Sequence, residues 1–485
     1  MARDPRVFSI PAGAPFLATL ADGILDGTLI PGTAFRDDPL ALADLTVFLP
    51  TRRAARALAT ALVDRLGGGA TVLPRIRPLG DVDDDGADGL TDPAGLDLPP
   101  PMDDPDRLVA LAGLVLDWRR RLAPEALVTP AGHPITVPAS TADAVHLARD
   151  LLALIDQAAV DGVDWSGLSA LVPDDYAAWW QLTLGFLGIA TGAWPAHLAE
   201  LGRMDPAAHR VAVLRSVAER LAAGGLGKPV IAAGSTGSQP ATAALLAAVS
   251  RLPNGAVVLP GLDFDLDEAT FAALPGGRVD GADSHPQAAL ARLLAVMGID
   301  RAGVRHLGTV SPAAATRARI LSDALLPASL TDRWPTISGR LAADPRGTAA
   351  ALRGLSIAVA ASEAEEALAI AAALRETLET PGAIAALVTP DRALARRVCA
   401  ELDRFGVSAE DTAGVPLART PPGVLALILA DCVAAGLDPV GVVALTRHPL
   451  AAFGLSRPRV RSAARALELT CLRGPRLAAG GEALV

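Results

Sequence analysis

Short apolar runs alternate with amphipathic segments at both ends of the first 310 residues. Near the N-terminus, apolar runs at residues 6–10 and 45–49 predict two strands. Each run is followed by a short loop and by helical spacing of apolar side chains, at residues 16–25 and 51–66. Alternation of strands and helices is typical of a parallel sheet, so the chain is predicted to begin as an α/β domain.

The pattern changes after residue 105 and returns near residue 226. Residues 106–225 hold five of the six tryptophans and show apolar residues spaced three and four apart, which predicts an all-helical insertion. Apolar runs at residues 230–233 and 256–259 then predict two more strands, with a helix that starts at Pro240 between them. The α/β domain is therefore predicted to be discontinuous.

A second α/β unit follows a segment rich in alanine, proline and arginine. Residues 355–360 and 385–388 predict strands, and residues 363–378 and 392–405 predict helices after them. The predicted division is a discontinuous domain (1–105 and 226–310), a helical insertion (106–225), a connector (311–350) and a second domain (351–485). The predicted fold class is α/β with two parallel-sheet domains, the first interrupted by the insertion.

The low lysine content excludes some classes of enzyme. Among 43 basic residues only Lys228 is a lysine. A phosphate-binding P-loop needs G-x-x-x-x-G-K-[ST] after a strand, whereas Lys228 precedes a predicted strand and is followed by Pro229. A P-loop ATPase of the standard kind is excluded. A lysine nucleophile is not predicted either, because Lys228 lies in a glycine-rich turn with no apolar pocket to lower its pKa.

The net charge of −10 comes from one stretch. Residues 81–106 contain ten aspartates and no basic residue, which predicts a solvated acidic loop and leaves the rest of the chain neutral. Net charge is therefore no objection to nucleic-acid binding. No apolar run approaches the roughly 18 residues of a membrane span, and no signal peptide is predicted. The three cysteines form no C-x-x-C pair, so a cytoplasmic protein without a membrane partner is expected.

Two loops after predicted strands are candidates for phosphate binding. Residues 11–15 carry two prolines, which remove backbone donors, so a tight structural turn is the interpretation there. Residues 234–238 are richer in donors, and the helix start after them could hold an anion. Neither loop contains G-x-G-x-x-G, so a dinucleotide site is not favoured.

Ser235 supports an alternative, a small-molecule hydrolase or nucleotide-dependent α/β enzyme. The sequence around it is close to a G-x-S-x-G elbow, and Asp263 and His285 or His306 follow in hydrolase order. The elbow needs its helix to start at the serine, whereas Pro240 places the helix start later. The acidic residues after the strand at 256–259 are read as a solvated loop, not as a metal site (Asp263, Asp265, Asp267, Glu268). No catalytic or metal-binding residue is assigned.

Two arginine clusters open helices directly after predicted strands. Helix starts at the carboxyl end of a parallel sheet are where open α/β sheets bind ligands, and arginine with threonine hydroxyls suits a nucleic-acid backbone. A solvated helix face is the alternative for either cluster alone. The candidate DNA-binding residues are Thr51, Arg52, Arg53, Ser235, Thr236, Thr389, Arg392 and Arg396.

These residues resemble AddB, a subunit of the bacterial AddAB helicase–nuclease, in its α-proteobacterial form. The resemblance spans nearly the whole chain. It is carried by VFSIPAG at 7–13, LTVFLPTRR at 45–53, LPRI at 73–76, VVLPGLD at 257–263, LVTPDRALARRV at 387–398, AGVPL at 413–417 and TPPG at 420–423. The stretch at 387–398 and its continuation are the most specific.

The resemblance implies two RecA-like domains of the superfamily 1 helicase type, with a 1B-like helical insertion in the first. Pro11, Ala12, Gly13 and Ala14 would then occupy the Walker A position without its lysine. Ala233 and Gly234 would occupy the end of the Walker B strand without its acidic pair. This motor is expected to be inactive, so that ATP and magnesium would belong to an AddA-like partner subunit.

The same resemblance implies a role in double-strand break repair by homologous recombination. The chain would bind DNA, as double-strand ends and single strands, and form a heterodimer with the AddA-like subunit. Family members are much longer, and this chain is expected to end inside an incomplete second domain, whether as a truncated product or a fragment. The nuclease, its metal and its iron–sulfur cluster would lie in a C-terminal half absent from this sequence.

Overall fold

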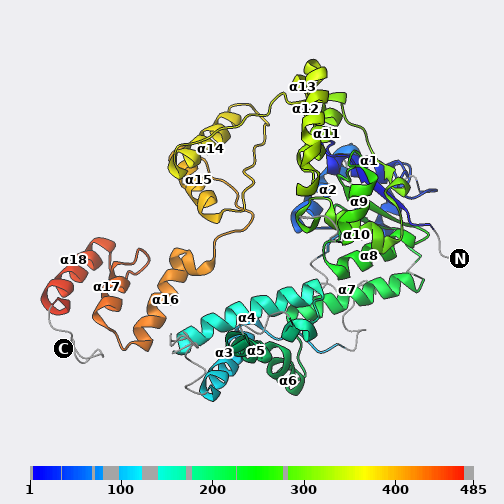
Figure 1. Cartoon of the computed structure of the whole chain (residues 1–485). Helices are drawn as coiled ribbons and strands as arrows, with labels where there is room; N and C mark the ends of the chain where they lie inside the picture. The colour runs from blue at the N-terminus through cyan, green and yellow to red at the C-terminus, as the bar shows by residue number, and fades with distance from the viewer. Residues whose placement is uncertain are drawn as a thin grey trace. The chain divides into compact units, whose positions relative to one another are not determined.

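The computed structural model describes residues 4–33, 35–67, 71–79, 98–122, 140–170, 177–224, 227–276 and 282–473. The chain divides into two compact units, Met1–Leu355 and Ser356–Val485, which are considered separately (Figure 1). Most of the predicted acidic loop, residues 80–97, lies outside the described residues. Among the described helices, none is both long enough and apolar enough to cross a membrane.

Unit 1 is built on a six-stranded sheet in the order β3-β2-β4-β5-β1-β6, and every described strand pair is parallel. The strands are β1 (Val7–Ile10), β2 (Thr46–Leu49), β3 (Arg75–Pro78), β4 (Val230–Ala233), β5 (Gly255–Pro260) and β6 (Arg305–His306). The prediction of an α/β fold with a parallel sheet is confirmed. All four strands predicted in this unit are present, and β3 and β6 were not predicted.

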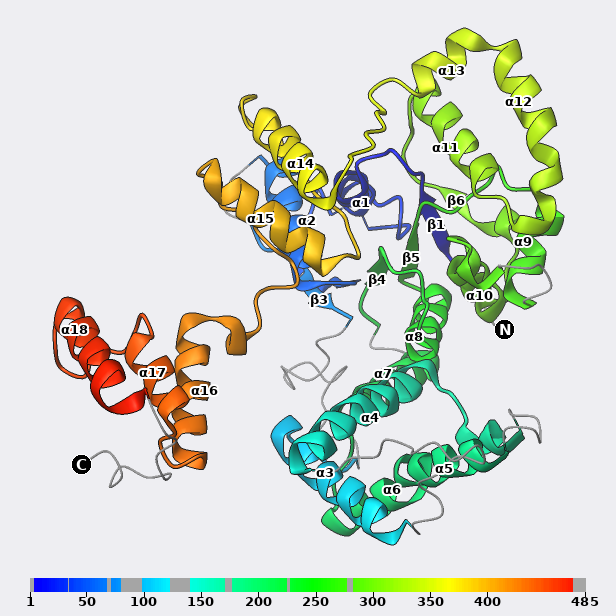
Figure 2. The ribbon, with the colours of Figure 1, turned by 60° about the vertical axis from the view of Figure 1, so that its left-hand side comes forward.

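Helices cover both faces of this sheet (Figure 2). These helices are α1 (Phe16–Leu25), α2 (Arg52–Arg65), α8 (Pro240–Arg251), α9 (Glu268–Ala273) and α10 (Ala288–Met297). Alternate residues of a strand point to opposite faces. In β4, Ile231 packs in the same cluster as α1 and α2, whereas Ala232 packs in the cluster of α8 and α10. The sheet is thus buried on both sides, which explains its nearly continuous apolar strands.

The chain leaves the sheet after β3 and returns at β4. Between them lie α3 (Asp104–Arg121), α4 (Thr141–Asp161), α5 (Ala177–Gly188), α6 (Trp194–Leu201) and α7 (Pro206–Ala222). The described residues of this region are mainly helical, as the apolar spacing predicted. A separate apolar cluster, which includes Leu111, Leu151 and Trp194, lies among α3, α4 and α6.

The predicted connector, residues 311–350, is helical. It contains α11 (Pro312–Ala324), α12 (Trp334–Ala343) and α13 (Pro345–Ala351). Ser311 caps α11 by accepting a hydrogen bond from the backbone N–H of Ala314. Arg317 on α11 donates to the carbonyl oxygens of Ala351 and Arg353, which holds the end of α13 against α11. This segment belongs to unit 1, so the predicted division of residues 1–355 into domain, insertion and connector stays a prediction.

Helices are the regular secondary structure of unit 2 in its described residues, and loops join them. Its helices are α14 (Glu363–Thr377), α15 (Arg392–Arg404), α16 (Pro421–Ala434), α17 (Pro439–Arg447) and α18 (Arg457–Leu467). The strands predicted at residues 355–360 and 385–388 are not formed, so the expectation of a second parallel sheet is wrong for the described residues. The backbone there is extended, but Ile357 and Val388 are 88% and 93% exposed. A strand needs a hydrogen-bonded neighbour, and the described residues of this unit supply none.

Candidate functional site

The loops at the carboxyl ends of β1, β2 and β4 meet in unit 1. Gly234, directly after β4, has a φ of +77°, a conformation that favours glycine. A Cβ atom built at Gly234 would lie 3.4 Å from both Phe16, the first residue of α1, and Pro50, the residue after β2. The close approach brings the three loops together at the edge where open α/β sheets bind ligands.

The loop after β1 forms a tight turn. The backbone N–H of Ala14 donates to the carbonyl oxygen of Pro11 at 3.2 Å. Gly13 has a φ of +91°, and a Cβ there would lie 3.4 Å from the Cβ of Ala314, so the start of α11 packs against the loop. Pro15 precedes α1 without any side-chain cap. The predicted nucleotide positions, Pro11, Ala12, Gly13 and Ala14, therefore present neither a lysine nor a hydroxyl.

The other predicted nucleotide positions, Ala233 and Gly234, end β4. β5 lies between β1 and β4, so these positions are one strand away from the loop after β1. The side chain of Ala233 is buried, and the backbone N–H of Gly234 donates to the carbonyl oxygen of Val258 at 2.9 Å. Neither residue provides a carboxylate that could hold magnesium.

A cavity of about 440 Å³ opens at the carboxyl ends of β2 and β4. We call it the β4 cavity. Its polar lining comes from the loop after β4, the first turn of α8, and α7 (Arg210, Ser235, Thr236, Ser238, Gln239, Thr242). The oxygen of Ser235 accepts a hydrogen bond from the backbone N–H of Gly237 at 3.2 Å. α8 begins at Pro240 with no side-chain cap, so its first turn has N–H groups for an anion.

Among the described residues, Arg210 is the one charged residue that lines the β4 cavity, and none of the described lining residues is a carboxylate. The side chain of Arg210 is exposed, and the described residues offer it no ion pair. The sequence did not single out this residue, because it lies on an ordinary amphipathic helix, α7, well before the loop that it faces. Its place in the β4 cavity follows from the packing of α7 against α8, which no local motif records.

Thr51, Arg52 and Arg53 stand beside this cavity, directly after Pro50, which also lines it. Thr51 is the N-cap of α2, as predicted, and its Oγ1 accepts a hydrogen bond from the backbone N–H of Ala54 at 3.1 Å. The hydroxyl hydrogen of Thr51 is still able to donate. Arg52 and Arg53 are exposed in the first turn of α2. The structure therefore groups these three predicted residues with Ser235 and Thr236.

The second arginine cluster lies in unit 2 and is placed differently from the prediction. No strand precedes α15 in the described part of this unit, so Thr389, Arg392 and Arg396 do not stand at the end of a parallel strand. The oxygen of Thr389 accepts from the backbone N–H of Asp391 at 3.0 Å. Arg392 makes a two-pronged ion pair with Asp411, at 2.6 and 3.1 Å.

The pair with Arg392 has an electrostatic consequence for Asp411. The hydrogen bond from the Arg392 guanidinium, together with that from the backbone of Ala413, holds the pKa of Asp411 below its ordinary value. Arg392 is thus already occupied by a carboxylate. Arg396, one turn further along α15, is exposed and makes no ion pair with the described residues.

A second cavity, of about 540 Å³, lies at the carboxyl ends of β1, β5 and β6 under α11. We call it the β5 cavity. Asp263, His285 and His306 line it, whereas Ser235 does not, and no histidine of the described ranges lines the β4 cavity. The serine, histidine and aspartate that a hydrolase needs are therefore not assembled, and α8 begins at Pro240 and not at Ser235.

The acidic residues after β5 are partly exposed, in keeping with the predicted solvated loop, and three of them are paired with arginines. Arg319 lies 3.2 Å from Asp265, Arg333 lies 2.8 Å from Asp267, and Arg301 lies 2.6 Å from Glu268. Asp263 accepts two backbone hydrogen bonds, from Asp265 and Leu266. Across the described residues, no group of histidine, cysteine or acidic side chains is arranged to hold a metal ion.

No protein-family model matches the sequence, and no curated protein matches it. A functional assignment therefore has to rest on the residues at the carboxyl edge of the sheet.

Proposed function

We propose that this chain is the helicase-like, ATPase-inactive part of an AddB-type subunit, acting in double-strand break repair, and that it binds DNA at the β4 cavity. The observation that carries the proposal is the lining of that cavity. Hydroxyl groups, the first turn of α8 and Arg210 converge there, with no carboxylate among the lining residues that the structure describes, in a chain whose net charge is −10.

The chemistry of the β4 cavity matches a phosphodiester. A phosphate oxygen accepts hydrogen bonds and cannot donate them. The donors that bind it in proteins include hydroxyls, guanidinium groups and the N–H groups of helix N-termini. Ser235 and Thr236 supply hydroxyls, and Arg210 supplies the positive charge. Arg52 and Arg53 follow Pro50 at the rim, where a neighbouring phosphate of the same strand would lie. Such contacts fix the position of a backbone without reading its sequence.

The loop after β1 supports an inactive motor. ATP hydrolysis by a P-loop needs a lysine on the β- and γ-phosphates and a hydroxyl on magnesium. The residues at this loop, Pro11 to Ala14, offer neither, and Ala314 packs against Gly13. In the proposal, the AddA-like partner holds ATP and magnesium, and this chain holds DNA and the partner. We expect no ATP turnover by this chain alone, measured as phosphate release with and without DNA.

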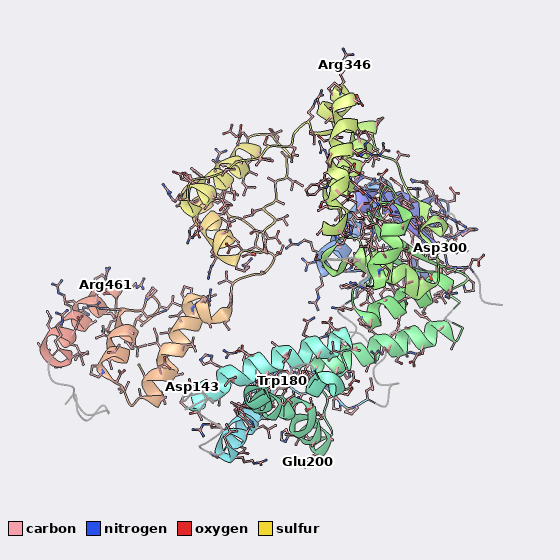
Figure 3. The ribbon with its side chains drawn as sticks, viewed as in Figure 1. Asp143, Trp180, Glu200, Asp300, Arg346 and Arg461 are labelled. Carbon is pink, nitrogen blue, oxygen red and sulfur yellow. The ribbon has the colours of Figure 1, made fainter. Side chains whose placement is uncertain are left out.

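DNA binding is tested by fluorescence anisotropy over a salt range of roughly 50 to 200 mM. The test variant combines Arg52→Ala and Arg210→Ala. Log affinity falls with log salt, and each lost phosphate contact should make that slope less negative by about 0.9 for a duplex, so the two substitutions together should make it less negative by about 1.8. The matched control removes two arginines from exposed positions elsewhere, Arg346→Ala on α13 and Arg461→Ala on α18 (Figure 3). Equal affinity and slope in the test variant and the control would overturn the assignment.

Partner binding needs a separate measurement, because a DNA-binding surface does not show which subunit it works with. The chain should co-purify with an AddA-like subunit as a one-to-one complex in size-exclusion chromatography. The Arg52→Ala and Arg210→Ala variant should still form that complex, since its changes lie at the proposed DNA contact. Absence of the complex with the unaltered chain would contradict the partner assignment and leave the DNA assignment to its own test.

A further inference from the structure

The β5 cavity is a second concave site on the same sheet edge, and its chemistry differs from that of the β4 cavity. The chain leaves β1 through α1 towards β2, and it leaves β5 through α10 towards β6, on the other side of β1. Neighbouring strands whose connections run in opposite directions leave a crevice at their carboxyl ends, where α/β sheets bind ligands. A volume of about 540 Å³ is typical of small-molecule sites.

The charges around the β5 cavity oppose an anion. Asp263 and Asp265 line it, and none of its lining residues within the described part of the chain is an arginine or a lysine. Asp265 is paired with Arg319 at 3.2 Å, so the guanidinium of Arg319 is already occupied by that carboxylate. A phosphate or carboxylate ligand would therefore meet like charge without a partner. A ligand that is neutral, or positively charged, meets no such barrier.

His285 brings a buried hydrogen-bond donor to this cavity. Its side chain is 9% exposed. Its Nδ1 accepts a hydrogen bond from the backbone N–H of Gln287 at 3.1 Å, so the neutral ring carries its hydrogen on Nε2. Burial lowers the pKa of His285, against the opposing influence of Asp263 and of the Leu325 backbone, which keeps the ring neutral.

The Nε2 atom of His285 is buried and, apart from the influence of the Leu325 backbone, has no hydrogen-bond partner among the described residues. A buried donor without a partner destabilises the folded protein. A ligand that accepts a hydrogen bond from it would remove that cost. Asp263 offers the complementary group. Its Oδ1 is occupied by the backbone N–H groups of Asp265 and Leu266, which leaves Oδ2 able to accept from a ligand donor.

The remaining walls suit a flat ring. Phe264 and His306 stack with ring centroids 4.2 Å apart and planes inclined by 37°. α11 contributes apolar side chains to the cavity, among them Leu321 and Leu325. An aromatic pair and an aliphatic wall favour a planar aromatic molecule, because ring stacking adds to the burial of apolar surface.

We propose that the β5 cavity binds a small planar heteroaromatic molecule that carries no negative charge and presents a donor and an acceptor on one edge. Its ring lies against Phe264 and His306, its acceptor meets Nε2 of His285, and its donor meets Asp263. A free nucleoside has this chemistry, and a nucleotide does not. The inference concerns a different cavity from the proposed DNA contact and does not rest on the proposed function.

Isothermal titration of the full chain with adenosine, guanosine and cytidine, each beside its monophosphate, tests the inference without any variant. At least one nucleoside should bind saturably, and its monophosphate should bind at least about tenfold more weakly, because the phosphate adds charge near two carboxylates. The inference is overturned if no nucleoside binds, or if a monophosphate binds as tightly as its nucleoside.

Variants then locate the site. His285→Ala should weaken nucleoside binding by about tenfold through the lost hydrogen bond, and Phe264→Leu by roughly threefold through lost stacking. Arg210→Ala, in the β4 cavity, should leave nucleoside binding unchanged. His285→Ala should in turn leave DNA binding unchanged. If His285→Ala weakened DNA binding and spared nucleoside binding, the cavity would be part of the DNA contact and this inference would fail.

Discussion

Replacing Arg107 should destabilise the helical region of unit 1 strongly. Arg107 on α3 is 3% exposed and joins three carboxylates from different elements. Its Nη2 lies 2.6 Å from Asp156 on α4 and 2.8 Å from Asp205 at the start of α7, and its Nη1 lies 3.2 Å from Asp104. Burial alone would lower the pKa of Arg107, but the hydrogen bond with Asp156 and the charge of Asp205 raise it, so the guanidinium stays charged.

The size of the expected loss in the free energy of unfolding depends on which of the three carboxylates is buried. Asp104 is 84% exposed and would contribute less than about 0.5 kcal/mol, as exposed ion pairs do. Asp205 is buried and, besides Arg107, also accepts a hydrogen bond from Trp194 at 3.0 Å. Arg107→Met keeps an aliphatic side chain but leaves the buried carboxylate of Asp205 without its positively charged partner. Removing one member of a buried pair costs about 3–5 kcal/mol, which is the loss that we expect in the free energy of unfolding.

Urea unfolding followed by tryptophan fluorescence measures this loss, because five of the six tryptophans lie within residues 106–225. The control is Arg120→Met on the same helix, whose exposed pair with Asp117 should contribute less than about 0.5 kcal/mol. Adding Asp205→Asn to Arg107→Met removes the stranded charge and should restore part of the stability. If the double variant were no more stable than Arg107→Met, an unpaired buried charge would not be the cause.

Three further predictions concern the site elements. Thr51→Ala removes the cap of α2 and should lower the free energy of unfolding by about 1 kcal/mol in urea denaturation, while Thr51→Ser should not. Asp411→Asn releases Arg392 and should strengthen DNA binding by up to about fivefold in anisotropy, whereas unchanged or weaker binding would place Arg392 outside the DNA contact. Because the pKa of His285 is lowered on folding, the unfolded chain binds more protons, and stability should fall as pH drops below about 6.5; His285→Gln should abolish that slope.

Local sequence was sufficient for the four central strands of the sheet and for the helices α1, α2 and α8. The apolar runs at β1, β2, β4 and β5 are short, continuous and followed by helix starts, so their type follows from the residues themselves. β3 and β6 were missed for a physical reason. β3 is only partly buried and both residues of β6 are exposed, and they are strands because the neighbouring strands β2 and β1 hydrogen-bond to them, not because of their own composition.

The two strands predicted in unit 2 are not formed, and the reason is again whether a neighbouring strand is present. Residues 355–360 and 385–388 have strand composition, but composition does not supply a neighbouring strand. The helices α14 and α15 formed as predicted, because helical hydrogen bonds lie within one segment. The helices of residues 311–350 were missed because alanine, proline and arginine show no clear apolar period there.

The sequence by itself determined the class of the sheet, the cap of α2, the start of α8 at Pro240, and the loss of a phosphate-binding lysine, because each depends on residues close together in the chain. Only the tertiary structure placed Arg210 of α7 among the hydroxyls after β4, and His285 beside Asp263 in the β5 cavity. Those groups come from separate elements, and packing of helices on a sheet, which no single segment encodes, decides which of them meet.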